Sequence, residues 1–211
     1  MQKTCLTEIS NTQLLNRYTI KFIDETLFYQ LLSNEFLHYF PKELIIKSDD
    51  LCKKYQRLNQ CDPQFPQVET LYLSIQHDDR PIALFKGFPV SPHIFLMDIT
   101  VIHPEYRRQG LYSAFLHALL DYTKQAGYSM VISQHSPSNN HILIAKLKAG
   151  FYISKMMISP AFGPEVELCY FHNPDLKVAF LYRCGDLVMN KNIAEHSRGT
   201  VKVLTELLAG I

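Results

Sequence analysis

The chain has 211 residues, of which 47% are hydrophobic and 19% are charged, and its formal net charge is +1. This composition is typical of a folded globular protein and excludes a disordered one. Near neutrality leaves no electrostatic basis for binding nucleic acid or an anionic membrane surface. No apolar run approaches the roughly 20 residues of a membrane helix, and the N-terminus lacks a signal-peptide core. We therefore expect a cytoplasmic protein that binds neither nucleic acid nor membrane.

The cysteines number five, which is odd, and none of them shows CxxC spacing. This pattern indicates reduced thiols rather than a disulfide framework or a zinc site. We expect no bound metal.

The first third of the chain combines a short strand with helices. Residues 18–23 alternate apolar and polar side chains, which predicts a strand. Residues 25–39 carry apolar side chains at helical spacing, and residues 41–58 predict a second helix. Residues 62–66 contain two prolines and predict a stiff connector.

Three strand candidates follow, at residues 70–76, 81–86 and 94–101. Polar or Gly/Pro turns at 77–80 and 87–92 separate them, so they predict an antiparallel meander. The third candidate is rich in β-branched and large apolar residues, which predicts burial on both of its faces.

A helix and a second central strand come next. Pro104 ends the strand over 94–101, and apolar residues at helical spacing predict a helix over 110–126, closed by Gly127. Residues 128–133 predict the following strand. Because a strand–helix–strand crossover of this length joins parallel strands, we expect the two strands to be parallel.

The last part predicts a helix over 140–149 and strands over 151–158, 166–171 and 177–183. Residues 201–208 predict an amphipathic helix or a docked segment. The chain as a whole predicts an α/β (α+β) fold, with a mixed, mostly antiparallel sheet flanked by helices.

The turn between residues 94–101 and the next helix has the features of an anion site. Arg107, Arg108, Gln109 and Gly110 lie where that helix begins. A helix N-terminus presents unpaired amides and a partial positive charge, and guanidinium groups suit phosphate oxygens. Gly110 lets a phosphate approach the backbone closely. The turn therefore predicts a phosphate-bearing ligand.

This turn resembles the acetyl-coenzyme A motif of the GNAT N-acetyltransferases, Arg/Gln-x-x-Gly-x-Gly/Ala. Residues 107–112 read Arg-Arg-Gln-Gly-Leu-Tyr and match it except at Tyr112, which replaces the small residue. Residues 101–106, Val-Ile-His-Pro-Glu-Tyr, also resemble the end of the family's central strand.

A second motif resembles the same family over residues 139–151. An asparagine there opens a short helix that ends in Gly-Phe, and Asn139, Gly150 and Phe151 have the expected separation. Many relatives place a tyrosine, which protonates the leaving thiolate, four residues before that glycine. Lys146 stands at this position, so we do not transfer the tyrosine's role. Lys146 either contacts the cofactor or is a solvated helix lysine.

The resemblance implies the GNAT fold, in which two parallel central strands splay apart. It implies one acetyltransferase domain over residues 1–211, made of three parts: a helical part over 1–65 that covers the acceptor, a cofactor-binding core over 70–171, and an extension of strand and helix over 172–211. A homodimer through the tail strands is a further expectation.

The resemblance also implies the activity, transfer of an acetyl group from acetyl-CoA to a primary amine of a small molecule or peptide. The amine would attack directly in a ternary complex. One alternative is a non-catalytic module with the same fold that senses acyl-CoA or binds a partner. Another is transfer of a longer acyl chain, or transfer to a hydroxyl.

Cofactor contacts are implied at two places. The pantetheine arm would pair with the backbone of Thr100, Val101 and Ile102 between the splayed strands. The expected contacts at the turn, the helix start and the second motif are Arg107, Arg108, Gln109, Gly110, Leu111, Tyr112, Ser113, Asn139 and Lys146.

Acetyl transfer to an amine needs a neutral nucleophile, donors for the oxyanion, and a proton for the leaving thiolate. Asp98 is the first candidate base, because burial in an apolar strand would raise the pKa of its carboxyl group. Alternatively, Asp98 pairs with a nearby lysine or arginine, or faces solvent. His103 is a second candidate base, and Ser133 and His135 are candidates to relay or donate a proton. Deprotonation through water, without a dedicated base, is the remaining alternative.

Overall fold

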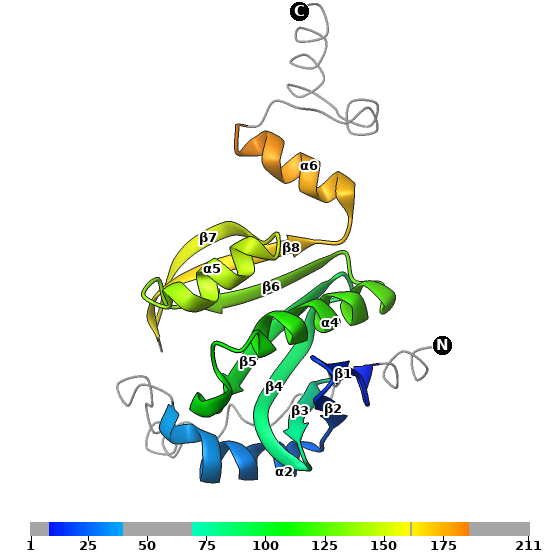
Figure 1. The fold of residues 1–211 in the computed structure, drawn as a ribbon. Coiled ribbons are helices and arrows are strands. Elements are labelled where there is room, and N and C mark those ends of the chain that lie inside the picture. Colours follow the sequence, from blue (N-terminus) through cyan, green and yellow to red (C-terminus); the bar gives the residue numbers. More distant parts are fainter. Residues whose placement is uncertain (1–8, 40–68, 161, 186–211) are drawn as a thin grey trace, which may run out of the picture. The chain divides into compact units, whose positions relative to one another are not determined.

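Figure 1 shows the computed structural model, which describes residues 9–39, 69–160 and 162–185. The helices expected over 41–58 and 201–208 and the connector expected at 62–66 lie outside these residues. Contacts divide the chain into two compact units, with the boundary between Tyr170 and Phe171. The first unit carries all the residues that the sequence nominates for function. None of the described helices is both long and apolar enough to cross a membrane.

The described N-terminal part contains two short strands and a helix that changes its pitch. The strand expected over 18–23 is β2 (Tyr18–Phe22), which pairs antiparallel with β1 (Gln13–Leu14). The helix expected over 25–39 is α2 (Glu25–Leu31), followed by the π-helical turn η1 (Leu32–Phe36) and the 3₁₀ turn η2 (Leu37–Tyr39). Asp24 begins α2, because its carboxylate accepts a hydrogen bond from the amide of Leu27 at 2.8 Å.

The predicted antiparallel meander is confirmed as β3 (Leu71–His77), β4 (Arg80–Ser91) and β5 (Ile94–Ile102). The turn expected at 87–92 is wrong. β4 continues through this stretch, and the hairpin turns only at Pro92 and His93.

The crossover from β5 through α4 (Leu111–Gln125) to β6 (Met130–His135) is also confirmed. β5 and β6 run parallel, and their pairing extends from Ile94 opposite Met130 to Met97 opposite Ser133. This pair of parallel strands lies at the centre of a mixed sheet.

After β6 come α5 (Asn140–Lys148), β7 (Tyr152–Ser159) and β8 (Gly163–Phe171). The eight strands form one sheet in the order β1-β2-β3-β4-β5-β6-β8-β7, so β8 lies between β6 and β7.

The strand expected over 177–183 is wrong, because this stretch belongs to α6 (Pro174–Arg183). The Asn173 side chain accepts hydrogen bonds from the amides of Asp175 and Leu176, and proline suits the first helical position, so the local sequence starts a helix. A dimer remains a prediction. Its expected route is not available, since β8 has a neighbour on each side and the second tail segment is helical.

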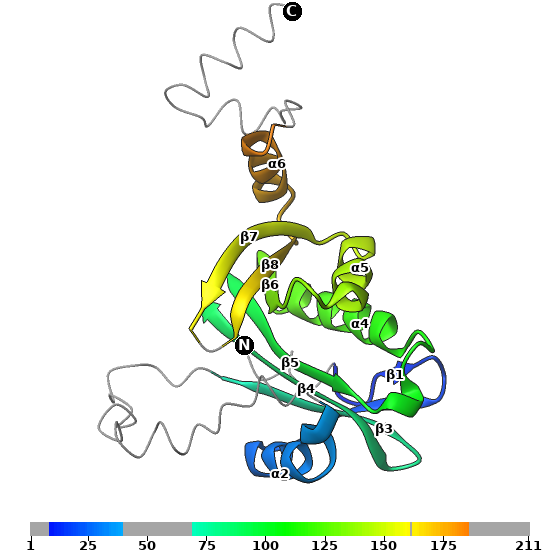
Figure 2. The ribbon, with the colours of Figure 1, turned by 90° about the vertical axis from the view of Figure 1, so that its left-hand side faces the viewer.

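Helices of the first unit cover opposite faces of the sheet (Figure 2). On one face, α4 contributes buried residues such as Phe115 and Leu119 to a core cluster with Phe95 and Met97 of β5. On the other face, Phe28 of α2 packs in a second cluster with Val101 of β5. β5 therefore contributes to both cores.

Gly87 in the middle of β4 is a point of close approach. A Cβ atom there would lie 2.7 Å from ring atoms of both Phe85 and Phe95 and 2.8 Å from the carbonyl oxygen of Leu96. Glycine is required because these rings and the backbone of β5 occupy the space that a side chain would need.

We predict that Gly87→Ala destabilises the protein by about 1–3 kcal/mol, because overpacking moves ring and backbone atoms that have no room to relax. Chemical denaturation measures the free energy of unfolding. Val90→Ala is the control, since this side chain is exposed in the same strand. Equal unfolding free energies for the Gly87 variant and the original protein would contradict the prediction.

Candidate functional site

The parallel pairing covers only the first half of β5. No pair joins β5 to β6 beyond Met97 opposite Ser133, while β5 stays paired with β4 as far as Ile102. We call the place where the two strands part, at Met97 and Ser133, the fork. Alternate backbone groups of a strand point to each of its sides. Residues 98–102 therefore turn part of their backbone toward the gap, and the expected splay is confirmed.

A β-bulge at Asp98 lies directly beyond the fork. Gly87 of β4 is opposite Met97 and Lys86 is opposite Ile99, so Asp98 has no partner on β4. An extra residue bends a strand and reverses which face each later side chain occupies. Accordingly Met97 packs in the α4 cluster, whereas Ile99 packs against the α2 cluster.

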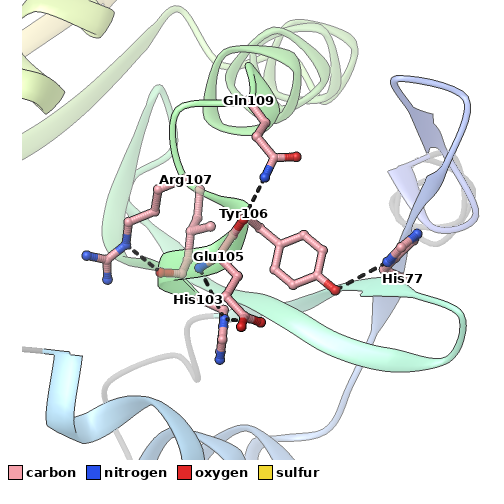
Figure 3. A network of polar contacts seen from close by, with 7 residues as sticks. His77, His103, Glu105, Tyr106, Arg107 and Gln109 are labelled. Atoms are coloured by element: carbon pink, nitrogen blue, oxygen red, sulfur yellow. Dashed lines mark hydrogen bonds and ion pairs between the residues drawn. The ribbon is translucent and has the colours of Figure 1, made fainter.

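The turn after β5 is braced by its own side chains (Figure 3). It contains the short 3₁₀ helix η5 (Pro104–Tyr106). The Nε atom of Arg107 donates to the carbonyl of Ile102 at 2.8 Å, and the Nε2 atom of Gln109 donates to the carbonyl of Glu105 at 2.6 Å. These two contacts hold both ends of the turn, so Gln109 and the Nε side of Arg107 stabilise the turn.

The turn also leaves an open surface for an anion. Residues 107–110 are all exposed, and Gly110 adopts the left-handed conformation, with φ 80°, directly before α4. The first amides of α4, those of Leu111, Tyr112 and Ser113, have no acceptor within the helix. A Cβ atom at Gly110 would meet only Leu15, at 4.0 Å. Within the described residues, the space beside Gly110 at this helix start is therefore open.

Two side chains of the motif take different orientations. Tyr112, the departure from the family motif, packs against the α4 core cluster, and burial raises the pKa of its phenol. The ring is therefore part of the core packing, while the backbone amide of Tyr112 lies in the first turn of α4. Arg108 is exposed and makes no hydrogen bond or ion pair within the described residues, so its guanidinium is available to a ligand.

Asp98 does not have the buried setting on which its nomination as base depended. Its side chain is 34% exposed, and its Oδ2 atom lies 2.8 Å from the Nζ atom of Lys86. Burial lowers the pKa of Lys86, but the hydrogen bond and the charge of Asp98 outweigh that effect and raise it overall. The pair lies on the α2 face, since the Lys86 amine also approaches the Tyr29 ring of α2, at 6.0 Å.

Lys146 is not a solvated helix lysine, because it is only 1% exposed. Its Nζ atom donates to Ser133 Oγ at 2.6 Å and to Met97 Sδ at 3.2 Å, the two residues that define the fork. Burial lowers its pKa well below the usual value of a lysine. The Nε2 atom of His135 lies 3.1 Å from Ser133 Oγ, which completes a chain of three polar side chains.

The remaining nominated residues lie at the rim of this arrangement. The Nδ1 atom of His103 accepts from the amide of Glu105 at 3.4 Å and lies 3.7 Å from its carboxylate, so the ring belongs to the turn. Asn139 is exposed immediately before α5 and makes no capping hydrogen bond with its side chain. In the part of the chain that is described, no three histidine, cysteine, aspartate or glutamate residues are grouped to hold a metal ion.

Sequence reasoning did not find Lys86 or Met97. The register of β4 against β5 brings Lys86 to Asp98, and that register depends on a bulge that leaves no mark in the hydrophobic pattern. Met97 was part of an ordinary apolar strand. The hydrophobic pattern of α5 did not indicate that Lys146 is buried. Two apolar residues near it, Ile144 and Leu147, are 52% and 43% exposed, so the apolar residues of this helix do not mark its buried face.

Comparisons with known proteins agree with this geometry. Residues 28–151, more than half of the chain, match the acetyltransferase (GNAT) family. No curated protein sequence matches the chain significantly.

Solved structures share the fold at low identity. Ard1 from Thermoplasma volcanium is 14% identical with a TM-score of 0.51, over 74% of this chain and 97% of its own. A GNAT family acetyltransferase from Elizabethkingia anophelis with acetyl-CoA bound is 13% identical with a TM-score of 0.51, over 74% of this chain and 99% of its own. An aminoglycoside 6'-acetyltransferase type Ii is 12% identical with a TM-score of 0.54, over 74% of this chain and 97% of its own. With a forked parallel pair, an open anion turn and a family match over most of its core, the chain belongs to the acetyltransferase (GNAT) family.

Proposed function

We propose that this chain transfers an acetyl group from acetyl-CoA to a primary amine, which attacks the thioester directly while both substrates are bound. The observation that carries this proposal is the gap beside residues 98–102, which begins at the fork and leads along β5 into the turn before the open start of α4. Phosphate groups suit the amides of Leu111, Tyr112 and Ser113 and the unpaired guanidinium of Arg108. The gap beside residues 98–102 then offers backbone groups to an extended pantetheine arm.

The backbone of β5 does most of the binding in this proposal. Amides and carbonyls of Thr100 and Val101 pair with the amides of the arm, and a main-chain N–H in this stretch polarises the thioester carbonyl. The carbonyl of Ile102 is already held by Arg107, so Ile102 contributes through its remaining backbone atoms. Asn139, immediately before α5, and Lys146 of α5 contact the donor.

The acceptor is a small-molecule or peptide amine that approaches from the α2 face. Asp98 lies on that face, immediately beyond the fork. There its carboxylate takes the proton that an incoming ammonium group must lose before it attacks, while the contact with Lys86 holds the carboxylate in place. Ser133 and His135 lie on the opposite face, where they serve the leaving thiolate.

Calorimetry with acetyl-CoA tests the binding half of this proposal, and free CoA released across a panel of primary amines tests the transfer half. Binding together with release supports the enzyme. Binding with no release from any amine would favour a non-catalytic acyl-CoA sensor. The absence of binding at millimolar acetyl-CoA would remove the proposal altogether.

We predict that Gly110→Val weakens acetyl-CoA binding about ten- to a hundredfold, since it blocks a charge-assisted contact between backbone amides and phosphate. Gly127→Val is a matched control. Gly127 also has a positive φ, 88°, and no atom within 4 Å of the added Cβ, but it lies at the other end of α4. Both variants carry similar backbone strain, of order 1–3 kcal/mol. Calorimetry should show weakened binding for the Gly110 variant only, and an equal loss in both would point to strain rather than to phosphate contact.

We predict that Asp98→Asn lowers kcat about a hundredfold, within the usual range for loss of a general base, while affinity for acetyl-CoA changes little. Steady-state kinetics with a reactive amine from the panel measures this. Lys86→Met is the comparison, because it breaks the same ion pair but keeps the carboxylate. If the pair is purely structural, both variants unfold more easily and both retain the original kcat.

A further inference from the structure

The amine of Lys146 occupies the point where the central strands separate. Lysine is almost never fully buried unless its charge is paired, yet Lys146 is 1% exposed. The two side chains that it contacts, Met97 and Ser133, stand opposite each other at the last position where β5 and β6 pair. The amine thus reaches from α5 to the floor of the fork.

No carboxylate compensates this amine among the described residues. None of the ion pairs in residues 9–39, 69–160 and 162–185 includes Lys146, and burial lowers its pKa. The groups that face it are His135 and Ser133 of β6, Met97 of β5 and the Phe151 ring, whose centroid is 4.7 Å from Nζ. An uncompensated buried ammonium is unfavourable, so the resting side chain is a neutral amine.

The hydrogen bonds give this neutral amine a defined direction. It has two N–H groups and one lone pair, and the contacts to Ser133 and Met97 use both N–H groups. Ser133 accepts from Lys146, so its own hydrogen is directed to Nε2 of His135. Burial, with a smaller effect of any charge on Lys146, lowers the pKa of His135 to about 3, so its imidazole is neutral. With the ring hydrogen on Nδ1, its Nε2 atom accepts the hydrogen of Ser133. The lone pair of Lys146 is left for a proton from a ligand.

We propose that Lys146 carries a proton from the acceptor nitrogen to the departing sulfur, an inference that rests on the proposed function. As the C–N bond forms, the acceptor's second N–H bond breaks and the lone pair of Nζ takes the proton. As the C–S bond breaks, Nζ gives the proton to the thiolate and an S–H bond forms. Lys146 returns to a neutral amine, and Ser133 and His135 hold its lone pair in position.

The ultraviolet absorbance of the thiolate in the complex with CoA tests this without any acceptor. If the amine neighbours the sulfur, the two groups share one proton, and the thiolate forms at a lower pH than in free CoA. We expect Lys146→Met to raise that pH by about one unit, a tenfold change in the thiolate fraction. Lys148→Met, which removes an exposed lysine of the same helix, should leave it unchanged. A CoA analogue without sulfur supplies the baseline.

The outcomes separate this inference from the proposed function. Equal titration of the thiol in the Lys146→Met complex and in the original complex overturns the role of Lys146 and leaves acetyl transfer standing. No binding of CoA by the original protein overturns the proposed function instead. If Lys146→Met does not fold, the original protein alone decides, because a bound thiol that titrates like free CoA also overturns the inference.

A rate measurement adds a readout that a structural role would not change. With a reactive amine from the panel, Lys146→Met should lower kcat about a hundredfold, with little change in the KM for acetyl-CoA. The proton carrier must be neutral, so acid lowers kcat of the original protein through Lys146 as well as through the acceptor amine and its base. The acid limb of the Lys146→Met variant should therefore be less steep than that of the original protein. An unchanged kcat, or an acid limb of unchanged steepness, would contradict the proposal.

Discussion

Asp98, which has no partner residue on the neighbouring strand β4, separates the two halves of β5. This bulge determines which face of the sheet the side chains on either side of it occupy. Before it, β5 pairs on both sides and packs its Phe95 and Met97 side chains under α4. After it, the strand keeps only β4, and its odd-numbered side chains turn to the α2 core. A bulge bends a strand where it occurs. The gap between the central strands begins at this extra residue, and Gly87 on the neighbouring strand leaves room for the Phe85 and Phe95 rings and the Leu96 carbonyl beside it.

The turn after β5 shows how a site can be rigid and still open. Arg107 and Gln109 use their polar groups to hold backbone carbonyls of the turn. Arg17 adds a contact from the N-terminal part, 3.1 Å from Gln109 Oε1. The backbone amides at the start of α4 are thereby fixed without being covered. Because a helix start binds anions through its backbone, the large side chain of Tyr112 is compatible with the site once its ring packs into the core.

Much of this architecture could be predicted from the sequence, because the periodicities of β3, β5, α4 and β6 reflect the burial of their side chains. The turn from Arg107 to Gly110 was recognisable from its residue types, which themselves provide the chemistry. The exceptions have a common cause. The local sequence pattern does not predict an environment that a strand distant in sequence provides. The ion pair of Lys86 with Asp98 and the burial of Lys146 both depend on the register of strands across the sheet. The strand predicted over 177–183 is wrong because the contact that starts α6, the capping of the Asp175 and Leu176 amides by Asn173, lies outside that run of residues.

The reversal of β5 at its bulge also separates two sets of side chains that evolution can alter independently. Changes in α2, which includes Tyr29, and in η1 alter the surface on one side of the sheet. α4, α5 and the turn that precedes α4 lie on the other side. Mutations on one surface leave the packing beneath the other largely intact, since the two clusters share the strands β3, β4 and β5 but have no side chain in common. In a scaffold of this kind, single amino-acid replacements on one surface can change which molecules are modified, while the donor stays the same.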